Sequence, residues 1–555
     1  MEPKSPSKSK LQVIGSNQNC RILKIGATLL IILSLVLAGG VFLFKPDIFH
    51  SVSERDSYYT VVLDCGSTGT RVNVYRWMVE NGVSKGNLPV LLEGYPGNLA
   101  KSDGCQYHCM QSEPGLDKFV GNASGVRASL EPLIRLAEQW VPLEKHGVTP
   151  IFVLATAGMR RLASKDARQV LEDVEDVVKK YRFLYRKDWI RVLSGKEEAY
   201  YGWVSLNYKM GVLGNLSRLP SLGLLDLGGS SLQVVTEVDE SREDEHLLIS
   251  VIGSIEHQLL AYSLPAFGLN EAFDRSVVML THTEALRESG AGMFEVRHPC
   301  LSSSYLQNYT CHGCFGLDRT NFGNITGEME EKQLSSILLT GSSNWEQCKV
   351  LARATAVNSS TPQLSRLEDH SNCTGLSSPA GSIMLNLTSN SLLIRHYNAL
   401  SGFFAISNRL NLSGTANLTK LWETGQHLCP RLWADQTSTS GHDCFRVPYM
   451  ASLLEDALCL RNVEIIFGPG DISWTSGAAL IEGDYMWLGT AQSAKGNFGP
   501  RNHRIISSPI ILFIFLSFLL FIVHCKRIKL PMPGRKVSSA RTRLPSYLCP
   551  KRQPV

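Results

Sequence analysis

The chain has 555 residues, of which 44% are hydrophobic and 19% are charged. This length and balance allow ordinary domains with apolar cores, and they exclude a chain that is disordered in bulk. The formal net charge of +5 comes from the two ends, because residues 45–504 hold 41 basic and 49 acidic side chains. The basic ends therefore do not indicate nucleic-acid binding by the segment between them.

The first apolar run, residues 25–44, carries no charge and is long enough to cross a bilayer as a helix. A cleaved signal peptide is the alternative. However, the run is longer than a signal core, and no clear small-x-small cleavage site precedes Lys45. Residues 1–24 hold five Lys or Arg and one acid, so we expect this tail to be cytoplasmic.

The next feature is an apolar run that ends in the segment Asp64-Cys-Gly-Ser-Thr-Gly-Thr-Arg71. We predict a strand, a tight turn and a second strand. Glycines let the backbone approach an anion, and successive N–H groups in such a turn form an anion-binding concavity. An aspartate at the strand end suits Mg²⁺ or Ca²⁺ with its water shell. A single motif is weak evidence, because a β-hairpin with a glycine turn has the same pattern.

An α/β pattern follows the first motif. Residues 151–155 and 189–193 are predicted strands, and apolar residues recur at helical spacing over 167–181. A further helix is predicted to begin at Glu197 and Glu198, directly after the second strand. A carboxylate at such a junction is placed for general-base catalysis, although acids also favour helix N-termini for electrostatic reasons alone.

The first motif recurs 162 residues later as Leu225-Asp-Leu-Gly-Gly-Ser-Ser-Leu-Gln233. Both copies place an aspartate at the end of an apolar run and follow it with glycine and hydroxyl residues. Two such loops can hold one polyphosphate from both sides. The repeat therefore favours phosphate binding over two unrelated hairpins.

Cysteines and glycosylation sequons indicate an oxidising compartment for residues 46–504. Eleven of the fourteen cysteines lie there, and ten can form five disulfides if Cys65 is a buried strand residue. Cys300, Cys311 and Cys314 with His298 also allow a zinc site, but disulfides suit a glycosylated domain better. The nine Asn-x-Ser/Thr acceptors, none of them in a tail, are Asn122, Asn215, Asn308, Asn324, Asn358, Asn372, Asn386, Asn411 and Asn417.

The second apolar run, residues 505–523, precedes a tail over 524–555 with nine Lys or Arg and no acid. We predict a second transmembrane helix and a basic cytoplasmic tail. The whole chain is then a two-pass membrane protein. Its central domain is extracellular or lies in the lumen of the Golgi or endomembrane system.

Together these segments resemble the apyrases, or ecto-nucleoside triphosphate diphosphohydrolases. The resemblance covers roughly residues 56–498, and four of its five signature segments match specifically. The segments are 64–71, 155–160, 193–203, 225–233 and a weaker one at 474–478.

The resemblance implies an α/β fold of two ribonuclease-H-like lobes, similar to actin, hexokinase and the heat-shock ATPases. Lobe I would comprise residues 56–186 and a returning segment at 471–498, and lobe II residues 187–470. Each lobe would contribute one phosphate loop to the cleft between them.

The resemblance also implies a reaction. Family enzymes use Ca²⁺ or Mg²⁺ to cleave nucleoside tri- and diphosphates to monophosphates. Glu198 matches the base that deprotonates the attacking water, and Ser231 matches the hydroxyl that helps to hold this water. Arg71 and Arg160 are either structural or phosphate-facing. The expected phosphate-binding residues are Gly66, Ser67, Thr68, Gly228, Gly229 and Ser230.

Four residues match the family's metal site. Asp64 and Asp226 correspond to the aspartates that hold the metal through its water ligands. Thr156 and Gln233 correspond to residues near the metal and the attacking water. No covalent phosphoenzyme is needed, since phosphoryl transfer can proceed by positioning and charge neutralisation alone.

Other functions remain possible from the sequence. A sugar or small-molecule kinase of the same superfamily is disfavoured, because the domain faces away from cytosolic ATP. A lumenal nucleoside diphosphatase that supports glycosylation is an alternative. So is a non-catalytic nucleotide-binding membrane protein, although the presence of both Glu198 and Ser231 argues against it. The sequence does not indicate an oligomeric state.

The sequence departs from the family pattern where the base should bind. Family enzymes typically hold the base between two aromatic rings of the second lobe. Phe403 or Phe404 can supply one ring, whereas alignment of residues 449–460 puts Leu458 in place of the other. We therefore expect little discrimination between bases, and a lower KM for Leu458→Tyr.

The charge pattern and the sequons generate a prediction on topology. In sealed vesicles whose cytoplasmic face is outward, protease should remove epitope tags from both ends and leave residues 46–504 intact. Glycosidase treatment should lower the apparent mass. Immunoblots before and after detergent permeabilisation check both results. A terminal tag that survives until the membrane is opened would contradict the two-helix topology.

Overall fold

The computed structural model describes most of the chain between residues 57 and 486. Within this described part, no helix is both long and apolar enough to span a membrane. The predicted membrane segments, 25–44 and 505–523, lie outside it. The described ranges are 57–79, 88–95, 111–213, 219–239, 244–283, 287–288, 294–310, 337–358, 373, 376–378, 381–383, 387, 393–434, 442–484 and 486.

The first sheet has the strand order β3-β2-β1-β5-β6, with β4 paired to β2. Strand β1 pairs antiparallel with β2 and parallel with β5. Both faces of β1 are buried, since Val61 and Leu63 pack in one core cluster and Val62 in another. This is why the segment reads as a continuous apolar run. The strands are β1 (Ser57–Cys65), β2 (Thr70–Met78), β3 (Val90–Tyr95), β4 (Gln111–Ser112), β5 (Ile151–Ala155) and β6 (Ile190–Val192).

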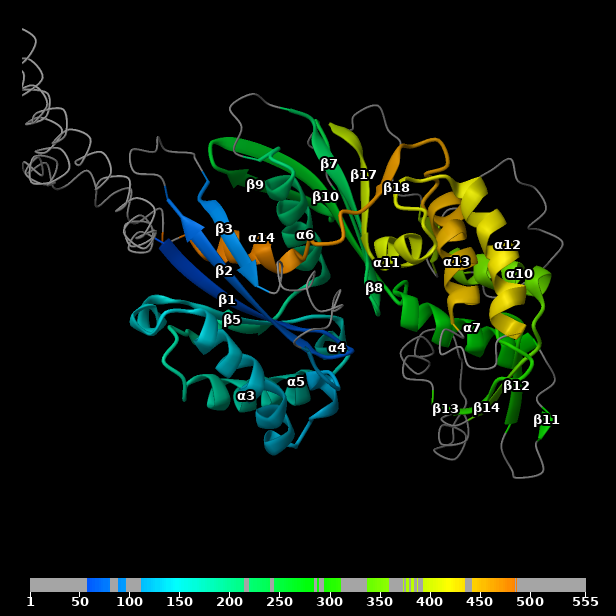
Figure 1. The fold of residues 1–555 in the computed structure, drawn as a ribbon, viewed down its shortest axis with the longest axis horizontal. Helices are drawn as coiled ribbons and strands as arrows, with labels where there is room; N and C mark the ends of the chain where they lie inside the picture. The colour runs from blue at the N-terminus through cyan, green and yellow to red at the C-terminus, as the bar shows by residue number, and fades with distance from the viewer. Residues whose placement is uncertain are drawn as a thin grey trace, which may run out of the picture. The chain divides into compact units, whose positions relative to one another are not determined.

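The second sheet repeats this plan. Its order is β18-β19-β17-β7-β8-β10-β9, and β7 pairs antiparallel with β8 and parallel with β17. The two sequence motifs are thus the matching corners of two similar sheets, coloured blue and green in Figure 1. The strands are β7 (Ser221–Leu227), β8 (Ser231–Glu237), β9 (Leu247–Ile252), β10 (Ile255–Pro265), β17 (Ile394–Ser401), β18 (Gly414–Thr415) and β19 (Ile465–Phe467).

Helices α6 (Gly195–Lys209) and α14 (Trp474–Glu482) lie between the two sheets (Figure 1). They share one core cluster with residues from both sheets. Their contact is close, because a Cβ atom on Gly477 would lie 2.1 Å from the Tyr201 carbonyl oxygen. Only glycine fits there, which explains the glycine of the fifth signature segment.

The other helices cover the outer faces. Helices α3 (Ala123–Trp140) and α5 (Ser164–Val178) pack on the first sheet. The second sheet carries α7 (Leu269–Thr283), α10 (Trp345–Ala356), α11 (Gly402–Arg409), α12 (Leu418–Ala434) and α13 (Asp443–Ser452). Short elements complete the described part: α4 (Ala157–Arg160), β11 (Arg287–Glu288), β12 (Phe294–His298), β13 (Leu306–Tyr309), β14 (Ile337–Gly341), β15 (Leu376–Ser378) and β16 (Gly381–Ile383).

The α/β class and the elements expected around the motifs are confirmed. Both hairpins form, and the strands expected at 151–155 and 189–193 are β5 and β6. The helices expected near 167–181 and from residue 197 are α5 and α6. Strand β6 pairs with β5, so the first sheet continues past residue 186, where we expected lobe I to end.

The described cysteines behave as expected for an oxidising compartment. Cys65 is buried and free, and the disulfides are Cys300–Cys348, Cys373–Cys459 and Cys429–Cys444. Cys300 is therefore not available to zinc. His298 is also engaged, because its Nε2 lies 2.9 Å from the Ser276 hydroxyl and its Nδ1 accepts from the Cys300 N–H. The remaining predicted disulfide partners, Cys105, Cys109, Cys311 and Cys314, lie outside the described residues.

Five of the nine sequons fall on described residues. Asn122, Asn308, Asn411 and Asn417 are exposed, and Asn358 is half-buried. Glycosylation at these positions stays a prediction. The other acceptors, Asn215, Asn324, Asn372 and Asn386, lie outside the described residues.

Candidate active site

The two glycine-rich loops meet where the sheets approach each other. In each hairpin the first glycine closes the turn: the Gly66 N–H donates to the Gly69 carbonyl at 3.0 Å, and the Gly228 N–H to Ser231 at 2.9 Å. The Ser230 hydroxyl donates to the Ser67 hydroxyl across the junction at 2.9 Å. The sequence predicted both hairpins, and the structure brings their hydroxyls into direct contact.

Glycines on neighbouring segments make room for both loops. A Cβ atom on Gly115 would lie 2.6 Å from the Ser67 carbonyl oxygen, and one on Gly158 would lie 2.9 Å from the Ser67 Cα. In the second half, a Cβ on Gly268 would lie 2.4 Å from the Ser230 nitrogen. Sequence reasoning missed Gly115 and Gly268, because a lone glycine gives no signal that another backbone segment packs against it.

The second loop presents its N–H groups to the junction. Two N–H groups at the start of α7 donate to the carbonyls of Gly228 and Gly229, at 3.0 and 2.8 Å. In a trans peptide the N–H points opposite to the C=O, so the N–H groups of Gly229 and Ser230 face away from α7. These two, and those of Ser67 and Thr68, donate to no acceptor within the described part of the chain. Such a set suits phosphate oxygens.

Asp64 and Asp226 end the two matching strands β1 and β7. Burial raises the pKa of Asp64, while Arg71, whose Nη1 donates to Oδ2 at 3.4 Å, works to lower it. Burial also raises the pKa of Asp226; the Ser401 side chain opposes this shift and the charge of Asp64 adds to it. Arg71, whose role the sequence left open, is thus a partner of Asp64.

Glu198 lies on the first turn of α6, and 13% of its side chain is exposed. Arg160 holds it: Nη2 donates to Oε2 at 2.9 Å, while Nη1 donates to the Leu193 carbonyl at 3.0 Å. Burial raises the pKa of Glu198 to about 7; Arg160 opposes the rise, and the charges of Asp64 and Asp226 contribute to it. A carboxyl that titrates near neutral pH suits general-base catalysis.

The neighbouring Glu197 has a different role. It forms a capping box with Ser194 and pairs with Arg191, whose Nη1 lies 2.6 Å from Oε1. Burial alone would raise the pKa of Glu197, but the bonds from Ser194 and Arg191 hold it below its usual value. The sequence did not decide whether these acids serve catalysis or the helix N-terminus. In the structure, Glu197 stabilises the helix N-terminus and Glu198 faces the site.

Ser231, Gln233 and Thr156 complete the predicted set. The Gln233 Nε2 donates to the Ser231 Oγ at 2.7 Å, and Gln233 is the cross-strand partner of Asp226. Thr156 follows β5, and its N–H donates to the Cys65 carbonyl at 3.1 Å. All three side chains are buried. Every residue that the resemblance assigned to the site is thus on or beside the two loops and the strand ends next to them.

The site fits a hard cation held through water. Within the described residues, no group of three or more His, Cys, Asp or Glu could hold a metal directly. Asp64 and Asp226 nevertheless concentrate negative charge, since Asp64 is buried, Asp226 is half-buried, and the charge of Asp64 raises the pKa of Asp226. Carboxylate and hydroxyl oxygens are the donors that Ca²⁺ and Mg²⁺ prefer, and Mg²⁺ usually retains several of its waters.

An ion pair beside the loops was not predicted from the sequence. Arg161, next to α4, pairs with Glu271 in the first turn of α7. The same carboxylate accepts from the Ser230 hydroxyl at 3.3 Å. Glu271 therefore connects Arg161, which directly follows α4, to Ser230 of the second loop. The two partners are 110 positions apart in the sequence, so no local pattern indicates the pair.

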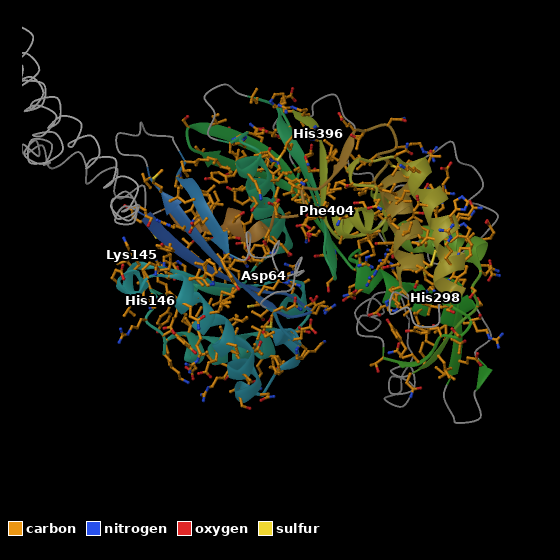
Figure 2. All side chains as sticks on the ribbon, in the orientation of Figure 1. Asp64, Lys145, His146, His298, His396 and Phe404 are labelled. Carbon is orange, nitrogen blue, oxygen red and sulfur yellow. A yellow bond between two sulfur atoms is a disulfide. The ribbon has the colours of Figure 1, made fainter. Side chains whose placement is uncertain are left out.

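The structure corrects part of the prediction for the residues that stack on the nucleotide base. Phe403 is fully buried and Leu458 is 1% exposed, both in the core beside the second sheet. The assignment of Leu458 to a stacking position is therefore wrong, and a tyrosine there would overpack the core. Phe404, labelled in Figure 2 with Asp64, is half-buried and lies next to Gly468. It is the one of the two phenylalanines that a ligand can reach.

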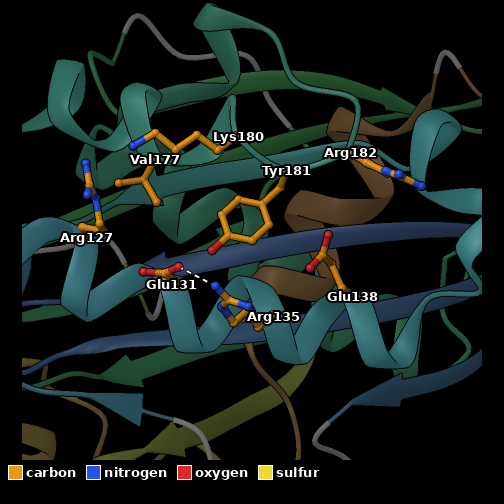
Figure 3. Close-up of a pocket in the computed structure, with 8 residues that line it drawn as sticks. All are labelled: Arg127, Glu131, Arg135, Glu138, Val177, Lys180, Tyr181 and Arg182. Atoms are coloured by element: carbon orange, nitrogen blue, oxygen red, sulfur yellow. Dashed lines mark hydrogen bonds and ion pairs between the residues drawn. The ribbon is translucent and has the colours of Figure 1, made fainter.

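A separate pocket of about 290 Å³ lies on the outer face of the first sheet, between α3 and α5 (Figure 3). Charged side chains, mostly exposed, line it, and Arg135 pairs there with Glu131 at 2.7 Å. None of the predicted site residues is among its lining residues. We interpret this pocket as a surface depression unrelated to the loops.

Comparison with known proteins identifies one family and several similar proteins. The model of the GDA1/CD39 (nucleoside phosphatase) family matches residues 50–493. The probable apyrase 7 of Arabidopsis thaliana is 36% identical over 542 residues, which cover 94% of this chain and 69% of that protein. Ectonucleoside triphosphate diphosphohydrolase 3 of Mus musculus is 26% identical over 84% of each chain.

Two further relatives are informative. A guanosine-diphosphatase of Schizosaccharomyces pombe is 32% identical over 44% of this chain and 42% of its own length. The crystal structure of nucleoside triphosphate hydrolases from Neospora caninum aligns with a TM-score of 0.50 and 14% identity, over 80% of this chain and 96% of that one. At this identity, the structural likeness establishes only the mixed α/β fold.

The contacts of Glu198 generate a prediction that needs no substrate. In the metal-free protein its carboxyl should be protonated below pH 7 and ionised above it, since burial raises its pKa to about 7. Arg160→Gln removes the opposing charge and should shift the titration to higher pH. Arg160→Lys should shift it less. Infrared difference titration, with Glu198→Gln as the blank, checks this. A titration at the ordinary pKa of glutamate, or one that Arg160→Gln leaves in place, would contradict the described contacts.

Proposed function

Because the chain belongs to the GDA1/CD39 (nucleoside phosphatase) family, we propose that it hydrolyses nucleoside tri- and diphosphates to monophosphate and phosphate. The observation that carries this proposal is the contact of two phosphate-type loops beside a buried glutamate whose pKa is about 7. A protein that only binds nucleotides needs the loops, but it has no use for a glutamate that can accept a proton near neutral pH or for the Ser231 hydroxyl beside the loops. The pair therefore favours an apyrase over a non-catalytic relative.

The two loops bind the phosphates. Unpartnered N–H groups in both loops and the hydroxyls of Ser67, Thr68 and Ser230 form the cradle, with Gly66, Gly228 and Gly229 allowing close approach. A phosphate between the loops replaces the Ser230–Ser67 hydrogen bond by bonds from both hydroxyls to its own oxygens. The two hydroxyls then fix the phosphate from opposite sides.

Glu198 accepts the proton of the attacking water. Its Oε2 is held by Arg160, so the other carboxylate oxygen is available to the water. Ser231 orients the same water, and the Gln233 amide, which donates to the Ser231 Oγ, leaves that hydroxyl hydrogen free to be directed. In-line attack on the terminal phosphorus then needs positioning rather than a covalent intermediate.

Ca²⁺ or Mg²⁺ would be held through water by Asp64 and Asp226, with Thr156 and Gln233 nearby. Bound there, the ion supplies charge neutralisation for the phosphate oxygens. We also propose that residues 25–44 and 505–523 anchor the domain in a membrane of the cell surface or endomembrane system. In this arrangement the glycosylated domain, built as two lobes, faces outside or into the lumen.

The paired glutamates on α6 provide the test of the reaction. Glu198→Gln should lower kcat by roughly 10²–10⁴, the usual contribution of a positioned base. A chelator should abolish phosphate release from ATP and ADP by the unmodified protein. Phosphate release at saturating Ca²⁺ or Mg²⁺ measures both effects.

Glu197→Gln is the matched control. Gln is also accepted at this position of a capping box, so the change removes mainly the partly exposed ion pair with Arg191. It should lower the free energy of unfolding by about 1 kcal/mol or less while activity stays within a few-fold. A Glu198→Gln protein with nearly normal kcat, or a Glu197→Gln protein as inactive as Glu198→Gln, would refute the assignment of the base.

Of the two phenylalanines expected to stack on the base, only Phe404 is accessible, and one stacking ring predicts weak base selectivity. ATP, GTP, UTP and CTP, and their diphosphates, should have similar kcat/KM values, because stacking on one ring accepts any base. Phe404→Ala should raise KM for all of them with little change in kcat, by about 1–3 kcal/mol of binding. Phe404→Tyr keeps the ring and should behave like the unmodified protein. A preference of more than about 100-fold for one base would reveal a specific contact elsewhere.

A further inference from the structure

The ion pair of Arg161 and Glu271 lies between the segments that support the two phosphate loops. Arg161 directly follows α4, whose Gly158 packs against the first loop: a Cβ atom there would lie 2.9 Å from the Ser67 Cα. Glu271 lies in the first turn of α7, whose N–H groups donate to carbonyls of the second loop. The pair therefore stands beside both loops, and the family resemblance assigned it no role.

One oxygen atom of Glu271 is shared by two donors. Its Oε1 accepts from the Arg161 Nη1 and also from the Ser230 hydroxyl, at 3.3 Å. A hydroxyl has a single hydrogen, and that of Ser230 also reaches the Ser67 Oγ, at 2.9 Å. Arg161 and Ser230 thus compete for the same carboxylate oxygen, and the shorter bond of the hydroxyl goes to the first loop.

Glu271 depends on Arg161 for compensation of its charge. Only 10% of the Glu271 side chain is exposed, against 36% of Arg161. Among the described residues, no other cation pairs with Glu271. A carboxylate that is mostly buried and unpaired is a strong acceptor, so it would draw the Ser230 hydrogen to itself. Its charge would also repel a phosphate group held by the second loop.

Helix electrostatics explain only part of this arrangement. An acid in the first turn of a helix is favoured by the positive N-terminus, and this is sufficient reason for an acid at position 271. It does not explain an arginine from the other half of the molecule, or an oxygen shared with a hydroxyl of the phosphate loop. These two contacts tie the charge of Glu271 to phosphate binding.

We propose that Arg161 is a positioning residue for phosphate binding, and that its ion pair with Glu271 sets the affinity of the second loop for phosphate groups. Arg161 cancels the charge of Glu271 and occupies the oxygen that would otherwise take the Ser230 hydrogen, which stays available to a phosphate oxygen. Glu271 in turn restrains a guanidinium that, once free, would bind phosphate itself and retain the product. This inference rests on the proposed function, because it assumes that phosphates bind between the loops.

The two single substitutions should act in opposite directions. Arg161→Gln leaves Glu271 uncompensated, so KM for ATP and ADP and the inhibition constant of inorganic phosphate should rise about 10-fold, as expected for one unit charge close to a binding site. Glu271→Gln keeps an acceptor of the same size for Ser230 and frees the guanidinium, so both constants should fall a few-fold. The double variant has a neutral pair and should return to within about threefold of the unmodified protein.

The measurement is steady-state cleavage of ATP and ADP by the detergent-solubilised full chain in Mg²⁺. Nucleotide products are quantified by chromatography, so that inorganic phosphate can be added as the competing product. Values of kcat should stay within a few-fold in all three variants, because Glu198 keeps its own arginine. Arg161→Lys retains the charge and should keep most of the affinity. Calorimetric titration with the β,γ-imido analogue of ATP, which is not cleaved, gives the same affinities without turnover.

An ion pair of similar exposure supplies the matched control. Arg461 pairs with Glu455 at 3.0 Å, with 49% and 14% of the two side chains exposed. Glu455 also accepts from a neutral donor, the Trp422 Nε1, at 2.9 Å. It follows α13, and Trp422 lies on α12, both outside the two loops. Arg461→Gln should therefore lower thermal stability about as much as Arg161→Gln and leave KM and phosphate inhibition unchanged.

The outcomes separate this inference from the proposed function. If Arg161→Gln and Glu271→Gln weaken binding alike and the double variant does not recover, the pair only holds the two halves together and the inference is overturned. Unchanged constants in both single variants overturn it as well, while nucleotide cleavage by the unmodified protein leaves the proposed function standing. An unmodified protein that neither cleaves ATP nor binds the imido analogue would overturn both.

Discussion

The accumulation of buried negative charge is the constraint on which the site depends. Asp64, Asp226 and Glu198 are brought together by two sheets and one helix, and the charges of the aspartates help to raise the pKa of Glu198. Arg71 and Arg160 each offset one acid by an ion pair, whereas no ion pair among the described residues offsets Asp226. A buried acid without full compensation either takes up a proton or recruits a cation. The arginines offset part of this charge, and under the proposed function a divalent cation would offset more of it.

The sequence predicted those parts of the fold that have a local signal. Both hairpins, β5 and α6 could be located because an apolar run buried on two faces, or a capping serine followed by an acid, is visible within a few residues. Glu198 could be assigned through the family resemblance. The pairing of Arg160 with Glu198 could not, because the two residues are 38 positions apart and nothing local links them.

The errors and omissions arise from tertiary contacts. Leu458 was placed at a binding surface by a short alignment, but packing around the second sheet buries it. Gly268 owes its identity to the backbone of the Ser230 loop, which a Cβ atom at this position would approach within 2.4 Å. A single sequence gives these residues no pattern, since spacing rules describe one element at a time. The structure reveals them, and it also allows matching positions of the two similar sheets to be compared.

That comparison also shows where the repeat is broken. Glu198 is the fourth residue after the N-cap Ser194 of α6, and the fourth residue after the N-cap Ser473 of the adjoining α14 is Gly477. The base has no counterpart, because the close approach of the two helices leaves no room for any side chain at Gly477. In the described part of the chain, the glycine-rich loop is thus repeated in both halves, whereas Glu198 is not. Under the proposed function this asymmetry gives the reaction a direction: a phosphate chain is cleaved from one end, and its nucleoside must lie at the other.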